Sequence, residues 1–184
     1  NGYSRGGEVV AGAPAEFELS GYAPGLRTLR LHHPSYEGFA LSVRIPAGRV
    51  LDLGDSTLLV TAEAAGRVLR IAFRSGAVLD SIPTRGRASH MLAVASSGTR
   101  WITANIVDGT ISRFDGPGEP VVLPVARAVE GIAISSDGRT GWVGSNGDSL
   151  VVVMDLDRGV AIDTLDGFGM PYRLGVSPDG RSVV

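Results

Sequence analysis

A five-residue phrase that ends in glycine recurs along the chain. It reads "VASSG" at 94–98, "ISSDG" at 134–138 and "VSPDG" at 176–180. The closing glycines, Gly98, Gly138 and Gly180, stand 40 and 42 residues apart. A period of this length is typical of a supersecondary unit that is repeated, because each unit buries its apolar face only by stacking on a neighbour.

The repeated phrase has the chemistry of a tight turn. Asp137 tolerates the backbone angles of a turn corner, and Gly138 supplies the positive φ that closes a hairpin. In the last copy Pro178 fixes φ at the first corner. We therefore expect the same β-hairpin in every unit, with each glycine in the left-handed region.

Four strand signals follow one another in the unit that is easiest to read. They are "GIAIS" at 131–135, "TGWVGS" at 140–145, "SLVVVMD" at 149–155 and "VAIDTL" at 160–165. The first is apolar on both faces, as expected of an innermost strand, whereas Asp163 and Thr164 of the last should face water. Across the units we align the apolar residues Val60, Ile102, Val143 and Val184. Four strands per unit of about 42 residues predict the blades of a β-propeller.

The stretch "WVGSNGDSLVVVMDLDRGVAIDTL", followed by "PYRLGVSPDG", resembles the YVTN-type repeat, a WD40-like β-propeller repeat. The resemblance covers residues 57–184 and implies a partial propeller at 54–184. It implies blades near 57–83, 91–126 and 131–165, with the next blade starting at 173. Closed propellers have roughly four to eight blades. We therefore expect further blades after residue 184, and exposed pairing edges at 58–62 and 181–184 without them.

Residues 1–53 do not follow the repeat. The segment 24–53 shows three alternating strand runs separated by "HPSYEG" and "PAG", and "APAEFEL" at 13–19 reads as an earlier strand. This pattern resembles the PEGA domain, a small β-sandwich-like module. The matching residues are Gly25, Pro34, Tyr36, Glu37, Phe39 and Gly48. The resemblance implies an all-β chain, with a PEGA-like module at 1–53 whose Tyr36 and Phe39 anchor a small core.

Composition excludes several classes of site. The net charge of −2, without basic clusters, argues against nucleic acid as a partner. The chain has no cysteine, which excludes disulfides and thiolate sites, and no lysine, which excludes Schiff-base chemistry within these residues. No apolar run approaches the roughly 18 residues of a membrane-spanning helix, so we expect no transmembrane segment in this fragment.

Candidate ligand-binding residues lie where the inner strands begin. His90 precedes "MLAV", Glu130 precedes "GIAI", and Tyr172 with Arg173 precedes "LGV". The entrances of inner strands gather around one mouth of a propeller channel, so these side chains can converge although they are far apart in sequence. Alternatively, they cap the strands and face channel water.

Other polar clusters do not predict a metal, a cofactor or a catalytic residue. His32 and His33 are consecutive, so a strand points them to opposite faces. The aspartates of 155–166 superficially resemble a calcium loop, but Gly159 stands one position early and a hairpin accounts for the same residues. "GFGMPY" lacks the third glycine and the helix of a dinucleotide site.

The sequence favours a non-enzymatic binding, scaffolding or sensor protein of the bacterial cell envelope. Both resemblances imply an extracytoplasmic location, in the periplasm or on the cell surface, and a propeller face suited to a protein or glycan ligand. The alternative is a propeller enzyme, either a lactonase or a haem- or quinone-dependent oxidoreductase, with its site at the channel mouth. A third hypothesis makes the chain the sensor part of a receptor kinase.

Overall fold

The computed structural model describes residues 25–33, 36–45, 57–116, 118–177 and 179–184, and shows an all-β protein, as predicted. Within these residues the only helix is one 3-10 turn, Glu63–Ala65. The chain divides into two compact units. One contains Asn1–Leu58 and Ile71–Leu79, and the other contains Leu59–Arg70 and Asp80–Val184.

The hairpin of the N-terminal region consists of β1 (Gly25–His33) and β2 (Tyr36–Ile45). The strands pair antiparallel, with an irregularity between Leu31 and His33. They coincide with the first two strand runs expected in this region. The third run at 49–53, the strand at 13–19, Pro34 and Gly48 lie outside the described residues, as do the surroundings of every side chain in β1 and β2. The PEGA-like module therefore stays a prediction.

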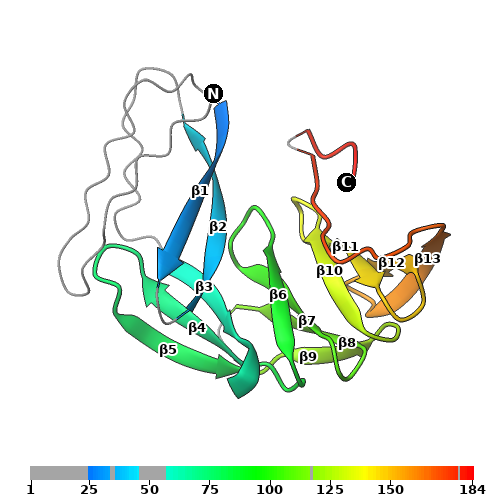
Figure 1. Ribbon diagram of the computed structural model, residues 1–184, viewed down its shortest axis with the longest axis horizontal. Helices are drawn as coiled ribbons and strands as arrows, with labels where there is room; N and C mark the ends of the chain where they lie inside the picture. The colour runs from blue at the N-terminus through cyan, green and yellow to red at the C-terminus, as the bar shows by residue number, and fades with distance from the viewer. Residues whose placement is uncertain (1–24, 34–35, 46–56, 117, 178) are drawn as a thin grey trace. The chain divides into compact units, whose positions relative to one another are not determined.

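Three further sheets follow in chain order, and we call them blades 1, 2 and 3 (Figure 1). Blade 1 consists of β3 (Thr57–Ala62), β4 (Arg67–Ala72) and β5 (Val78–Pro83). Blade 2 consists of β6 (Ser89–Val94), β7 (Arg100–Asn105), β8 (Thr110–Asp115) and β9 (Val121–Pro124). Blade 3 consists of β10 (Val129–Ile134), β11 (Thr140–Ser145), β12 (Leu150–Asp155) and β13 (Val160–Asp166). Each sheet pairs its strands in sequence order, as propeller blades do.

The repeated phrase forms the predicted hairpin. Ser135 Oγ donates to Asp137 Oδ1 at 2.6 Å, and that oxygen also accepts the backbone N–H of Arg139 at 3.0 Å. The backbone N–H of Thr140 donates to Ser135 Oγ at 2.9 Å. Residues 177–182 repeat all three bonds, at 2.6, 3.2 and 2.9 Å. The same residues at the same spacing therefore build the same turn twice.

The glycines of the phrase take the conformation that the hairpin requires. Gly98, Gly138 and Gly180 have φ of 73°, 76° and 71°. In each, the backbone N–H donates to the carbonyl three residues earlier, at 2.8–2.9 Å. A residue with a Cβ is strained in this region, which explains why glycine ends every copy.

The structure corrects the apolar alignment by one residue. Strand β3 of blade 1 corresponds to β7 of blade 2 and β11 of blade 3, and the fourth residues of these strands are Val60, Thr103 and Val143. Ile102 instead occupies the position of Trp142, and so does Val184, because Val183 pairs with Val176 as Gly141 pairs with Ile134. The register confirms this, because Ser89 pairs with Asn105 as Val129 pairs with Ser145. The slip at Ile102 follows from Thr103, a polar residue at a position that is apolar in the other two blades.

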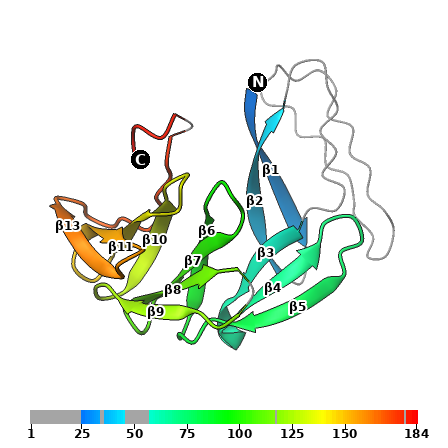
Figure 2. The same ribbon diagram turned by 180° about the vertical axis from the view of Figure 1, so that it is seen from behind.

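Two apolar clusters hold the blades together. The larger joins blades 2 and 3 and contains Ile102 and Ile111 together with Val143 and Met154. The smaller joins blades 1 and 2 through Val68, Trp101 and Phe114. In it the rings of Trp101 and Phe114 stack 3.6 Å apart at 7°. In Figures 1 and 2 blade 3 correspondingly lies directly beside blade 2.

A buried polar network fixes the segment between blades 1 and 2. Asn105 Nδ2 donates to Ser112 Oγ at 2.8 Å, and Ser89 Oγ donates to Asn105 Oδ1 at 2.7 Å. Ser112 Oγ donates to the carbonyl of Thr84 at 2.5 Å. These four side chains are fully buried. Since buried polar groups are costly without partners, the network holds the chain after β5 in one position.

Candidate functional site

The candidate residues lie on the side of the sheets where β6 and β10 begin, which we call the entrance side. His90 and Glu130 are the second residues of these two strands. In both blades the pairing with the next strand is irregular at this point, between Ser89 and Leu92 and between Val129 and Ile132. His90 and Glu130 therefore occupy equivalent places in neighbouring blades, and each lies where the strand bulges.

His90 is held by blade 1. Its Nδ1 lies 2.8 Å from Glu63 Oε2, and its side chain is 28% exposed. Thr61 Oγ1 donates to the carbonyl of His90 at 2.5 Å. Glu63 opens the short turn after β3, so this contact joins the turn between the first two strands of blade 1 to the first strand of blade 2. A carboxylate at Nδ1 fixes the ring orientation and leaves Nε2 directed elsewhere.

Glu130 is held within its own blade. Asn146 Nδ2 donates to Glu130 Oε2 at 2.7 Å. Asn146 follows β11 as Glu63 follows β3, so the same place in two blades carries the partner of an entrance residue. The carbonyl Oδ1 of Asn146 is buried and has no hydrogen-bond partner among the described residues. This entrance thus combines a carboxylate with an unsatisfied acceptor.

Tyr172 and Arg173 lie beside the start of β10. A Cβ on Gly131 would lie 2.4 Å from the carbonyl oxygen of Pro171 and 2.9 Å from the backbone N of Arg173, so the two segments touch. Tyr172 is 46% exposed, and the Arg173 guanidinium lies 5.8 Å from its ring centroid. The structure thus brings Tyr172 and Arg173 next to the Glu130 segment. It gives no side-chain contact between His90 and Glu130 among the described residues.

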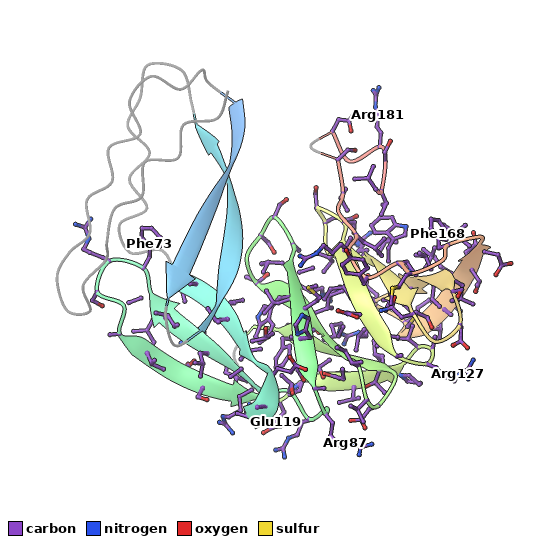
Figure 3. The ribbon with its side chains drawn as sticks, in the orientation of Figure 1. Phe73, Arg87, Glu119, Arg127, Phe168 and Arg181 are labelled. Carbon is purple, nitrogen blue, oxygen red and sulfur yellow. The ribbon has the colours of Figure 1, made fainter. Side chains whose placement is uncertain are left out.

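The same arginine–aspartate ion pair occurs on the entrance side of blades 2 and 3. The guanidinium Nε of Arg87 lies 2.6 Å from Asp108 Oδ1, and that of Arg127 lies 2.7 Å from Asp148 Oδ1. The backbone N–H of each arginine donates to the other carboxylate oxygen of its partner, at 2.7 and 2.9 Å. These backbone bonds, and then the guanidinium bonds, lower the pKa of both aspartates. Figure 3 labels Arg87 and Arg127, which extend from the blades into solvent.

The sequence analysis did not single out Glu63, Asn146 or these ion pairs. A signal for the ion pairs was present, because arginine precedes aspartate by 21 residues in both blades. The partners of His90 and Glu130 carry no such signal. Their identities differ between blades, and only the fold shows that Glu63 after β3 and Asn146 after β11 occupy equivalent places.

An open cleft lies on the entrance side between blades 1 and 2. Its volume is about 450 Å³. The charged residues that line it are Glu63, Arg67, Arg85, Arg87 and Asp108. Small residues complete the wall, among them Ala65, Gly66, Gly86 and Ala88. Glu63, whose carboxylate contacts His90, is thus one of the residues that line the cleft.

A second cleft, of about 390 Å³, lies on the opposite side, where the repeated hairpins are. Among its lining residues, Arg100 makes three polar contacts. Its Nε and Nη1 contact Asp115 Oδ1 and Asp157 Oδ1, each at 2.5 Å, and Nη1 also donates to the carbonyl of Gly138 at 3.0 Å. Hydrogen bonding to Asp157 lowers that carboxyl's pKa and raises the pKa of Arg100. Because Arg100 belongs to blade 2 while Asp157 and Gly138 belong to blade 3, this cluster joins the blades.

Two features are absent from the described part of the chain. No group of three or more histidine, cysteine, aspartate or glutamate side chains there could hold a metal ion. No helix there is long and apolar enough to cross a membrane.

No known family model and no curated protein matches the chain. Solved structures do. Hydrazine synthase of Kuenenia stuttgartiensis matches 71% of this chain and 38% of its own, with a TM-score of 0.63 and 23% identity. A 6-phosphogluconolactonase-like protein of Bacteroides uniformis matches 69% of this chain and 43% of its own, with a TM-score of 0.58 and 14% identity. The chain spans less than half of either protein. Both are propeller-like, so the likeness supports a β-propeller fold for this chain.

Proposed function

We propose that the chain is part of a β-propeller binding protein whose entrance side recognises a protein or glycan ligand. The observation that carries this proposal is that neighbouring inner strands begin with different polar groups, each fixed by its own partner. Glu63 holds His90, and Asn146 holds Glu130. Fixed donors and acceptors on a rigid sheet favour recognition, because little conformational entropy is lost on binding.

The phenol of Tyr172 adds a half-exposed aromatic surface beside Glu130. Aromatic rings with a polar tip are common in recognition sites, since they offer contact area and a hydrogen bond together. By the resemblance to YVTN and PEGA sequences, we further propose that the protein acts in the cell envelope, outside the cytoplasm.

The experiment is a screen of a glycan array and a peptide library, followed by variants in the protein that carries this chain. Glu130→Gln and Tyr172→Ala should each weaken a specific ligand about tenfold or more, since both remove a polar contact. Melting temperatures should change little. Thr99→Ala, on the hairpin side, is the control. Unchanged affinity in both entrance variants, or large melting losses with intact binding, would assign these residues a structural role.

A second function, hydrolysis, is favoured by the His90–Glu63 contact. A carboxylate on Nδ1 orients a histidine so that Nε2 can accept a proton from water or substrate. The likeness to a 6-phosphogluconolactonase-like fold agrees with this candidate but does not distinguish it. Lactone hydrolysis followed against pH would test it. His90→Asn should abolish turnover, whereas Glu63→Gln should lower kcat more than it changes KM. Equal turnover in both variants and the unmodified protein would exclude it.

A further inference from the structure

We propose that the entrance side binds a protein ligand through a cation, the side chain of a lysine or an arginine, which pairs with Glu130. The proposal rests on the recognition function given above and names the class of its ligand. It starts from the charge of Glu130, because no basic side chain among the described residues forms an ion pair with this carboxylate. Glu130 is partly buried, so its charge is partly removed from water.

Three other carboxylates on the entrance side each contact a basic side chain. They are Glu63 with His90, Asp108 with Arg87, and Asp148 with Arg127, at 2.6–2.8 Å. Among the described residues, the carboxylate of Glu130 accepts a hydrogen bond only from a neutral amide, that of Asn146. A carboxylate that is partly desolvated and unpaired is costly, and a cationic ligand would remove that cost.

The repeat explains why Glu130 has no counter-charge. Glu63 follows the last residue of β3, and from there it contacts His90 in the first strand of the next blade. Ile106 follows β7 in the same way, so it occupies the corresponding place opposite Glu130 in β10. The junction of blades 1 and 2 therefore contains an acid and a base, whereas the junction of blades 2 and 3 contains an acid and an apolar residue.

The carboxylate of Glu130 is held in position without being neutralised. Asn146 Nδ2 donates to Oε2 at 2.7 Å. Because the amide carries no charge, this bond fixes the direction of the carboxylate and leaves its charge in place. Oε1 remains for a donor of the ligand. A charge-assisted hydrogen bond from an ammonium or a guanidinium group to such an oxygen is stronger than one from a neutral hydroxyl.

The residues beside Glu130 suit the stem of a long basic side chain. Tyr172 belongs to the segment that lies against Gly131, and it is 46% exposed. On the other side of the junction, Val107 follows Ile106 and is 59% exposed. Lysine and arginine place their aliphatic stems along such surfaces while their charged heads remain free to pair.

Arg173 does not take the place of the ligand. Its guanidinium lies 5.8 Å from the ring centroid of Tyr172, and no ion pair joins it to Glu130. This distance is within the range of cation–π contacts, so the exposed ring is a surface on which a cation already lies. Glu130 and Tyr172 together therefore favour a cationic ligand over a neutral glycan.

The test is NMR titration of the chain with N-acetyl-lysine amide. N-acetyl-norleucine amide, which has the same alkyl chain without the ammonium group, and glucose are the neutral probes. The lysine probe should shift the side-chain amide of Asn146 and the backbone amide of Gly131 saturably, and the shifts should weaken as salt rises. The neutral probes should shift neither.

Equal shifts with lysine and norleucine probes, or saturable shifts with glucose alone, would overturn the cationic class. A specific glycan or peptide found in the screen described above, together with no shift by the lysine probe, would overturn this class and leave the proposed function standing. No specific ligand in the screen and no shift by any probe would overturn both.

A pair of variants separates contact with Glu130 from general attraction. Glu130→Gln should weaken binding of the lysine probe about tenfold or more, because the charge-assisted contact is lost while a side-chain oxygen remains for Asn146. Asp166→Asn makes the same change in net charge on the outer strand of the same blade and should leave the affinity unchanged. Equal losses in the two variants, or none in Glu130→Gln, would contradict the proposal.

A second pair of variants tests the comparison between junctions. Ile106→Lys supplies the missing base, so it should pair with Glu130 and weaken binding of the lysine probe about tenfold without lowering the melting temperature. Ile106→Met, which keeps an apolar side chain of similar size, should bind the probe as the unmodified chain does. Equal affinities of Ile106→Lys and Ile106→Met would contradict the placement of the cation at this junction.

Discussion

Blades 2 and 3 are built alike but are buried differently. Their first three strands begin 40 residues apart and their fourth strands 39, and both carry the Arg–Asp ion pair on the entrance side. Leu123 in β9 is 7% exposed, whereas Leu165 at the same place in β13 is 41% exposed. Likewise Ile102 is fully buried and its counterpart Trp142 only partly. Since Gly159 of blade 3 lies against Leu123, the difference comes from a neighbouring blade and not from the repeat itself.

The largest expected effect on stability is the difference between substitutions at Leu123 and at Leu165. Leu123→Ala should lower the free energy of unfolding by about 2–4 kcal/mol, because it opens a cavity between two blades. Leu165→Ala should cost less than about 1 kcal/mol, since its side chain is partly in water already. Chemical denaturation of both variants measures the difference.

Equal losses in the two variants would contradict the comparison. They would show that blade 3 has a partner over β13 that buries Leu165 in solution.

A smaller effect is expected at the repeated glycines. Gly138→Ala should cost about 1–2 kcal/mol, because a Cβ at positive φ is strained and would also lie 3.1 Å from Arg100 Cδ. At Gly98 and Gly180 no atom lies within 4 Å of the added Cβ, so alanine there should cost about 1 kcal/mol from strain alone. Denaturation midpoints in all three variants would test the order, and a Gly98→Ala variant less stable than Gly138→Ala would reverse it.

A substitution at Thr103 should stabilise the chain, unlike the substitutions above. Its hydroxyl is fully buried and has no hydrogen-bond partner among the described residues, while Val60 and Val143 hold the same place in the other blades. Thr103→Val keeps the shape and removes the unsatisfied group. It should therefore raise the free energy of unfolding by about 1 kcal/mol. Val143→Thr is the reciprocal variant and should lower it. A destabilised Thr103→Val would reveal a partner for the hydroxyl.

The smallest expected effect is a change in the stability of the chain at low pH. The pKa values of Asp108 and Asp148 are lowered by the arginines that bond them, so the unfolded chain binds more protons near pH 4. The stabilisation they provide is present above pH 4 and is lost as the pH falls through the lowered values. Asp148→Asn should thus destabilise the chain at pH 7 and leave it nearly unchanged at pH 2.5. Asp166→Asn, which removes no contact among the described residues, is the control. Equal penalties at both pH values would contradict the assignment.

The repeated hairpin could be predicted from the sequence because its chemistry is local. Ser135, Asp137 and Gly138 specify the turn within four residues, and the strands on either side follow. The partners of His90 and Glu130 could not be predicted in this way. They come from turns that are adjacent only after the sheets form, and they differ in chemistry between blades. The one-residue slip at Ile102 has the same origin, because alternation alone does not distinguish Thr103 as a core position.

The stack of Trp101 on Phe114 has a spectroscopic consequence. The chain contains two tryptophans, and blade 1 helps to bury Trp101 to 3% exposure, while Trp142 remains partly in water. Their fluorescence should therefore differ in wavelength, with the bluer emission from Trp101. Replacing Trp142 by phenylalanine would isolate this signal, and its red shift during unfolding would report when blades 1 and 2 separate. Replacing Trp101 would leave Trp142 as a probe of blade 3, so the two tryptophans report separately on the interface of blades 1 and 2 and on blade 3.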